Sequence, residues 1–453
     1  MAEQYDVRPV DRQILPGVTL MTYRTDRFKV GSFSISFLLP PDPKEAPARS
    51  LLLSVLRRGN RTYPTLADIN RRLDELYATP YYLLNSTRGG VHRIGFGADL
   101  LDEAYLPDCA ELFSSVLSLM GQMLFYPLTE QSGTLTERYI AAEKENAIDA
   151  VRSLKNHPSA YATAQFCEAF YEEELWGQML CGSEEQLRLI TSAQLSALWR
   201  KTLAAAPIRC VYVGSLSEDV VADQLRSLLS RELSRFGRLE HIEDVRLPEA
   251  PSPQKKRPPR LLEQQLSVGQ SHLILGFRTD VTLRSSEFYA MMLCHEILGL
   301  SPISRLFVYV RERLGICYSC SSDYHVDHGV LTVSCGISAQ NRELAQSAIL
   351  EQLEVMREGR FTDAELEAAR RSLANGYRQL SDSTRSIVRF YDLRSIWGVD
   401  QSVEQCRAAF ARLKREDVVA AARSLRLDMV YFLHGTGAPT SDAEQEGDGA
   451  DEY

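Results

Sequence analysis

Residues 32–40 read SFSISFLLP and residues 271–277 read SHLILGF, and the recurrence of this apolar segment decides the fold. In the first copy Phe33, Ile35 and Phe37 alternate with serine, and this period of two is typical of a strand with one buried face. Similar features follow each copy in the same order: a glycine-containing strand, a long amphipathic helix, a charged helix, a Trp-Gly pair, another helix and an apolar strand. The glycine-containing strands lie at residues 96–100 and 333–337, the amphipathic helices at 109–122 and 342–356, and the charged helices at 137–154 and 363–379. The Trp-Gly pairs lie at residues 176–177 and 397–398, the next helices at 190–201 and 413–424, and the closing strands at 209–215 and 429–435.

This recurrence indicates an internal duplication. We therefore predict an α+β protein with two homologous domains, each a mixed, mostly antiparallel β-sheet with helices packed on one face. Between them, residues 239–262 replace hydrophobic periodicity with prolines and charges, which is typical of a linker. The predicted domains are residues 1–238 and 263–436. The acidic residues 437–453 have too little apolar content to order themselves.

The composition excludes several classes of protein. With 453 residues, 44% hydrophobic and 25% charged, the chain has an ordinary globular composition. Six acids of the tail contribute to a net charge of −9, so the rest of the chain is near neutral, which argues against a nucleic-acid-binding protein. No apolar run approaches the ~20 residues that span a bilayer, and the polar N-terminal segment is unlike a signal peptide. We therefore expect a cytoplasmic protein whose nine cysteines are reduced thiols.

Two segments carry a resemblance to a known family. Residues 51–76 read LLLSVLRRGNRTYPTLADINRRLDEL and residues 304–322 read SRLFVYVRERLGICYSCSS. With the duplication, they resemble the pitrilysin/insulinase metallopeptidases, over nearly the whole chain apart from linker and tail. The chain is similar to the small two-repeat members, which assemble as pairs. Among these it resembles the bacterial subunits that lack the zinc motif.

In that family, a helix of the first repeat carries the inverted zinc motif H-x-x-E-H, which supplies two ligands and the general base. The resemblance aligns this motif with Ser50, Leu53 and Ser54, and the third zinc ligand with Ala150. A second acidic position of the family is retained as Glu143. All three ligands and the base are therefore missing, so we expect no cofactor in this chain and zinc only in a partner chain.

The histidines support this conclusion without an alignment. No two of the eight are four residues apart, so neither H-x-x-E-H nor H-E-x-x-H occurs in any frame. They are His92, His157, His241, His272, His295, His325, His328 and His434.

The second half retains a different part of the family pattern. Arg311 and Tyr318 match a family Arg and Tyr seven residues apart, which bind the substrate backbone and help to hold the polarised carbonyl. A guanidinium and a phenol stabilise an oxyanion that a metal alone compensates only partly. The alternative is that Arg311 belongs to a solvated helix face and Tyr318 is an ordinary strand residue.

Cys317, Cys320, His325 and His328 form the pattern C-x2-C-x4-H-x2-H, which superficially suggests a zinc site. Structural zinc sites usually separate the two ligand pairs by a dozen or more residues, so that two elements surround the ion. The short spacing instead predicts a β-hairpin that turns at residues 327–329.

Two functions remain open. The first is a proteolytically inactive subunit of a heterodimeric zinc peptidase, which supplies Arg311 and Tyr318 to a paralogue with an intact zinc motif. The resemblance implies that the pair encloses short unfolded peptides and binds them by strand addition. The second is a non-enzymatic peptide-binding or scaffold protein of the same fold, in the form of a homodimer. Neither reading involves a nucleic acid or a membrane.

Overall fold

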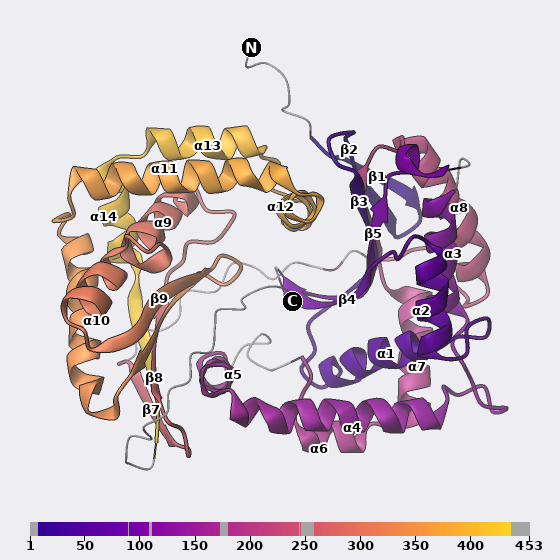
Figure 1. Cartoon of the computed structure of the whole chain (residues 1–453), viewed down its shortest axis with the longest axis horizontal. Helices are drawn as coiled ribbons and strands as arrows, with labels where there is room; N and C mark the ends of the chain where they lie inside the picture. The colour runs from indigo at the N-terminus through magenta and orange to yellow at the C-terminus, as the bar shows by residue number, and fades with distance from the viewer. Residues whose placement is uncertain are drawn as a thin grey trace.

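The computed structural model describes residues 8–88, 90–107, 111–172, 180–243, 245 and 258–435 (Figure 1). The predicted tail at residues 437–453 and the first Trp-Gly pair at residues 176–177 lie outside this range. None of the helices within it is both long and apolar enough to cross a membrane.

The first half of the chain contains a six-stranded sheet with strand order β1-β2-β6-β3-β5-β4. Strands β2 and β6 pair in parallel, and the other neighbours pair antiparallel. The predicted strands at residues 32–40, 96–100 and 209–215 correspond to β3, β5 and β6. The six strands are β1 (Val10–Leu15), β2 (Val18–Arg24), β3 (Val30–Leu39), β4 (Tyr81–Arg88), β5 (Val91–Leu101) and β6 (Ile208–Gly214).

The second half contains a five-stranded sheet with strand order β7-β11-β8-β10-β9. Here β7 and β11 pair in parallel and the remaining pairs are antiparallel. Apart from β1, each strand of the first sheet has a counterpart at the same place in the second. The strands are β7 (Arg260–Gln265), β8 (Ser271–Arg278), β9 (Cys317–His325), β10 (Val330–Ile337) and β11 (Arg426–His434).

The helices repeat in the same order, which confirms the predicted α+β duplication. Equivalent helices even begin alike: α6 and α13 start at the capping boxes Ser183–Gln186 and Ser402–Gln405, which satisfy backbone donors of the first turn. Two π-helical segments, η4 (Glu296–Leu300) and η5 (Leu306–Arg313), occur only in the second half of the described chain. The first-half helices are α1 (Ala46–Arg58), α2 (Leu66–Glu75), α3 (Leu112–Phe125), α4 (Glu137–Ser153), α5 (Pro158–Phe170), α6 (Glu184–Leu189), α7 (Ser192–Ala205) and α8 (Glu218–Ser234). The second-half helices are α9 (Phe288–His295), α10 (Arg342–Arg357), α11 (Asp363–Gln379), α12 (Thr384–Ile396), α13 (Val403–Arg412) and α14 (Arg415–Ser424).

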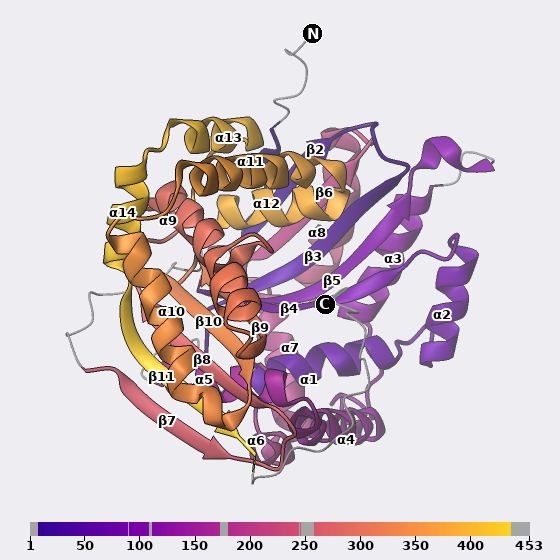
Figure 2. The same cartoon turned by 60° about the vertical axis from the view of Figure 1, so that its left-hand side comes forward.

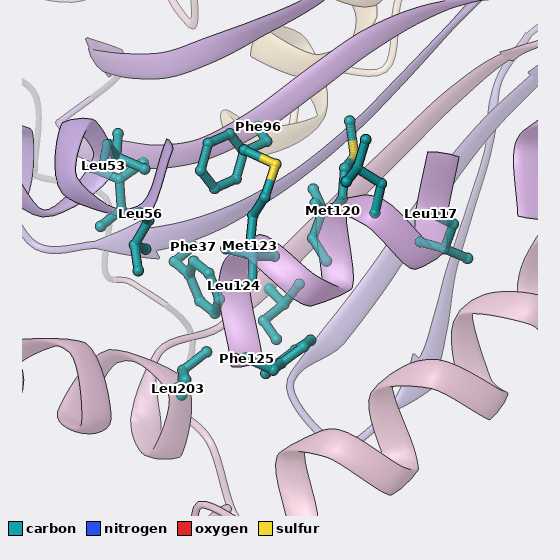
Figure 3. Packing of buried hydrophobic residues seen from close by; sticks show 14 of the residues in the cluster. Phe37, Leu53, Leu56, Phe96, Leu117, Met120, Met123, Leu124, Phe125 and Leu203 are labelled. Atoms are coloured by element: carbon teal, nitrogen blue, oxygen red, sulfur yellow. The ribbon is translucent and has the colours of Figure 1, made fainter. Parts of the chain in front are cut away.

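Each half has its own apolar core between its sheet and its helices. In the first, Phe37 and Phe96 of the sheet pack with Leu53 and Leu56 of α1 and with Met123 of α3 (Figure 3). Burying such a side chain contributes about 1.5–3 kcal/mol, so this cluster is the main source of stability for the half. The second core is equivalent, with residues of β8, β10 and β11 packed against α9 and α10.

The two halves exchange one helix each, an arrangement the sequence pattern did not predict. Helix α5 of the first half covers the second sheet, where Phe166 and Tyr161 pack with Ile274 and Tyr431. Helix α12 of the second half covers the first sheet, where Phe390 packs in one cluster with residues of β2 and β6 (Figure 2). Each sheet is therefore covered by its own helices on one face and by a helix of the other half on the opposite face.

The segment between α8 and β7 spans residues 235–259 and overlaps most of the predicted linker at residues 239–262. Strand β7 begins at Arg260, inside residues 239–262, and pairs in parallel with β11. Residues 244 and 246–257 lie outside the described chain.

Candidate functional site

The three positions aligned with the zinc motif lie on one helix face. Ser50, Leu53 and Ser54 of α1 line a pocket of about 200 Å³, together with Ala147 of α4. Ala150, the position aligned with the third ligand, is exposed and does not line this pocket. The other lining residues come from α1, β4, α6 and the segment before α6: Pro47, Leu51, Leu83, Asn85, Cys181 and Leu187.

A hydrogen-bond network occupies the polar side of this pocket. The Ser50 hydroxyl donates to the carbonyl of Leu180 at 2.7 Å and accepts from Asn85 Nδ2 at 2.9 Å. Asn85 Oδ1 lies 2.9 Å from His92 Nε2, and His92 Nδ1 lies 3.3 Å from Nη1 of Arg49. These partners are satisfied by a neutral imidazole that donates through Nε2 and accepts at Nδ1.

The electrostatics keep that imidazole neutral. Burial, with a smaller contribution from the Arg49 charge, lowers the pKa of His92 to about 4. A neutral histidine is a potential metal ligand, but both of its nitrogens already have partners. The network therefore functions as a structural link between α1 and the β4–β5 edge of the sheet.

The donor set does not fit a zinc ion. Leu53 is 2% exposed and belongs to the hydrophobic core in Figure 3. The Ser50 hydroxyl is engaged with Leu180 and Asn85, and Ala150 offers only a methyl group. The retained acid, Glu143, is buried and paired with the Arg58 guanidinium. Because zinc in proteins takes cysteine, histidine or carboxylate ligands, these four positions do not supply the ligands of a catalytic zinc ion.

Arg311 and Tyr318 lie in the second half, on η5 and β9. The Arg311 side chain is 40% exposed, stacks at 4.6 Å on the Phe307 ring and lies 3.8 Å from Glu312. Gly315 between them adopts φ +62°, a left-handed conformation that favours glycine and allows the sharp change from helix to strand. Tyr318 is 70% exposed. Within the described chain, no hydrogen bond or ion pair joins either residue to the α1 pocket.

A β-bulge explains the exposure of Tyr318. On β10, Gly336 pairs with Ser319 and Ile337 pairs with Cys317, so Tyr318 is the extra residue on β9. A bulge interrupts the alternation of a strand and reorients a side chain. It presents the Tyr318 ring to solvent while its neighbour Cys317 stays buried.

The predicted hairpin is present, and the four residues of C-x2-C-x4-H-x2-H are not brought together. Strands β9 and β10 pair around a turn that contains Gly329 at φ +60°. His325 lies 3.7 Å from Asp323, and the His328 ring packs against Tyr171. Cys317 and Cys320 instead lie beside Cys335 of β10. Residue spacing alone missed Cys335, whose position depends on the register in which Cys335 pairs with Cys320.

Comparison with known proteins supports the family resemblance. A family model described as Peptidase M16 inactive domain matches residues 190–373. A Bacillus subtilis protein named "Probable inactive metalloprotease YmfF" is 24% identical over 420 residues, which cover 93% of this chain and 96% of that protein. An uncharacterized zinc protease of Mycobacterium tuberculosis is 25% identical over 293 residues, 63% of this chain and 64% of that protein.

The fold has solved counterparts. The crystal structure of a conserved protein from Enterococcus faecalis superposes with a TM-score of 0.85 at 22% identity, and the match covers 96% of this chain and 100% of that one. The superposition establishes a shared fold. Together with the family-model match over residues 190–373 and the similarity to YmfF over 93% of the chain, it leads to one conclusion: the chain has the fold of the M16-like peptidases and is similar to their inactive members, in agreement with the pitrilysin/insulinase resemblance of its sequence.

Proposed function

We propose that this protein is the proteolytically inactive subunit of a heterodimeric zinc peptidase. In this proposal Arg311 and Tyr318 bind the substrate backbone and stabilise the polarised carbonyl, while a paralogue with an intact H-x-x-E-H motif supplies the zinc and the general base. The substrates are short unfolded peptides, and the complex acts in the cytoplasm.

One asymmetry supports the proposal. The α1 pocket has hydrocarbon at Leu53 and a satisfied hydrogen-bond network at Ser50, so it has no free donor set for a metal. Arg311 and Tyr318, in contrast, present a cationic and a phenolic group to solvent. Two such donors facing a developing oxyanion lower the barrier of acyl transfer when the site excludes water.

The competing function is a peptide-binding or scaffold homodimer without hydrolysis. It accounts for the loss of the zinc ligands and gives Arg311 and Tyr318 no catalytic task. The two functions therefore differ in the partner that they require and in the effect of removing these two side chains.

Co-purification from the native host tests the partner. The heterodimer predicts a stoichiometric paralogue that carries H-x-x-E-H, about one catalytic zinc per pair and peptidase activity that a chelator abolishes. A homodimer that hydrolyses no unstructured peptide, with or without added zinc, would support the scaffold instead.

Reconstitution of the pair tests the two residues. Arg311→Ala with Tyr318→Phe is expected to lower the kcat of the pair by about a hundredfold or more, because each change removes a transition-state donor. The matched control is Arg313→Ala with Tyr105→Phe: Arg313 is an exposed arginine on η5 that stacks on Tyr309, and Tyr105 is an exposed tyrosine of the first half. Equal activity of the double variant and its control would contradict the proposed role.

A further inference from the structure

Three buried cysteines meet on the face of the second sheet that the helices of its own half cover. Cys317 and Cys320 come from β9 and Cys335 from β10, and their sulfur atoms all lie within 4.8 Å of one another. All three belong to the core cluster of the second half. In a regular strand, residues three apart face opposite sides of the sheet. The bulge at Tyr318 resets that alternation, so Cys317 and Cys320 reach the same face.

The separation of the sulfur atoms suits a metal–thiolate site. Zinc–sulfur bonds are about 2.3 Å long, so the sulfurs of a tetrahedral site lie ~3.8 Å apart. The three thiols therefore need to approach one another by no more than about 1 Å, which rotation of the cysteine side chains can supply. Among the described histidine, cysteine and acidic residues, no fourth joins this group. Three thiolates complete a trigonal site for a monovalent ion, or leave one position of a tetrahedral site for an external ligand.

The three thiols interact with one another and with the charge of Arg311. Hydrogen bonds from the Cys320 and Cys335 thiols, together with the Arg311 charge, lower the pKa of Cys317. The hydrogen bonds to Cys317 raise the pKa of Cys320 and Cys335. A trithiolate that holds Zn²⁺ or Cu⁺ has a net negative charge, which the positive charge of Arg311 would partly balance.

We propose that Cys317, Cys320 and Cys335 form a trithiolate site for a thiophilic d¹⁰ metal ion, Zn²⁺ or Cu⁺. Binding replaces the S–H protons of the three thiols, which are released to solvent, with metal–sulfur bonds, and no oxidant or reductant takes part. The ion joins the start of β9 to β10 and so fixes the bulge that presents Tyr318. The site is independent of the proposed peptidase role, because it requires neither a partner chain nor a substrate.

The test uses the full chain, purified with reductant and freed of metal. Zn²⁺ is titrated in competition with a chromophoric chelator, and Cu⁺ in competition with bicinchoninate. We expect uptake of about one ion per chain, with the tighter of the two titrations identifying the ion. Cys335→Ser and Cys320→Ser should each weaken binding by more than about a hundredfold, since a direct ligand matters at least as much as a group that orients one. Cys294→Ser is the control, because Cys294 is a buried cysteine of the same core outside the cluster.

A second measurement needs no variant. X-ray absorption of the loaded wild-type chain counts the sulfur neighbours of the ion, and three at about 2.3 Å are expected. Fewer than two sulfur neighbours would overturn the proposal, as would uptake that Cys335→Ser leaves unchanged. So would a Cys320–Cys335 disulfide in the reductant-purified chain, seen as a mass loss of about two units, without metal uptake.

Discussion

His92 links the polar side of the α1 pocket to the first sheet. Its neutral ring bridges Asn85 of β4 and Arg49 of α1, and Asn85 in turn holds Ser50. Because both nitrogens of this buried ring are engaged, a proton added to Nδ1 would face the Arg49 guanidinium without an acceptor. The same contacts that keep the pocket rigid therefore make it sensitive to acid.

We expect the stability of the protein to fall between pH 6.5 and pH 4 through this residue. Because the folded-state pKa of His92 is about 4 and the unfolded value is near 6.5, only the unfolded chain takes up the proton in this window. Protonation of His92 in the unfolded chain should therefore make the free energy of unfolding about 2 kcal/mol lower at pH 5 than at pH 7.5. Urea denaturation of wild type and His92→Gln at both pH values isolates the contribution of His92 to this pH dependence, because the other buried histidines affect both proteins equally. A pH dependence that is the same in both proteins would contradict the assignment.

The sequence located some residues of the site and missed others, for a physical reason. Ser50, Leu53 and Ser54 could be placed on one helix face, because a helix repeats every 3.6 residues. Asn85 and His92 meet across two paired strands, where Thr87 pairs with His92. Cys335 likewise reaches Cys320 through strand register. Register depends on the whole sheet, so a local pattern does not report it.

At the scale of elements, helix α12 is held on the first sheet by charge as well as by apolar contact. Its Asp392 is buried. The carboxylate of Asp392 accepts a hydrogen bond from Arg209 Nε at 3.1 Å and forms an ion pair with the guanidinium of Arg93. Arg209 also pairs with Asp11 of β1 at 2.6 Å. Burial would raise the pKa of Asp11, but the hydrogen bond and charge of Arg209 and the hydrogen bond from Ser395 outweigh it and lower that pKa. The exchanged helix thus connects three strands of the other half.

Removing Asp392 should therefore be costly. Asp392→Ala leaves two sheet arginines partly unpaired in a buried site, and we expect a loss of about 3–5 kcal/mol of unfolding free energy. The matched control is Asp400→Ala, which removes an exposed carboxylate paired with Arg8 and should cost less than about 1 kcal/mol. Chemical denaturation measures both. A loss in Asp392→Ala as small as in the control would show that the buried pair does not hold α12.

The order of the elements could be predicted, but the exchange of α5 and α12 could not. Strong periodicity located α11 at residues 363–379 and β8 at residues 271–277, which agree with the structure within a residue. The apolar residues Tyr161, Phe166 and Phe170 indicate that α5 is buried on one side, yet both sheets offer an apolar face. The π-helical form of η5 has no sequence signature, because its composition equals that of an ordinary helix.

At the scale of the whole molecule, neither half is complete without the other. The second sheet relies on α5, whose last carbonyls, at Ala169 and Phe170, accept hydrogen bonds from Arg260 and Arg278 at 2.8–3.0 Å. Cations at a helix C-terminus also compensate the helix dipole. Without α5, an apolar face that includes Ile274 and Tyr431 would be open to water.

We therefore expect residues 258–435 not to fold alone. The isolated half should aggregate or bind hydrophobic dyes, because the surface that α5 covers becomes exposed. Coexpression with residues 8–243 should restore a stoichiometric complex, since each half then regains the helix that it lacks. A monomeric, cooperatively unfolding 258–435 would contradict this mutual dependence, and analytical ultracentrifugation with thermal denaturation distinguishes the outcomes.

The exchange of helices also determines which motions are open to the protein. In a protein of two independent lobes, the softest motion is a hinge at the connecting segment, and it disturbs few contacts. Here, rotation of one half against the other must slide α5 over one sheet and α12 over the other at the same time. Both sliding surfaces are packed like a core and crossed by buried charges, so the restoring force is high. We therefore expect rotation of one half against the other to be a stiff motion, so that a bulky ligand enters at the boundary with another molecule and not by separation of the two halves.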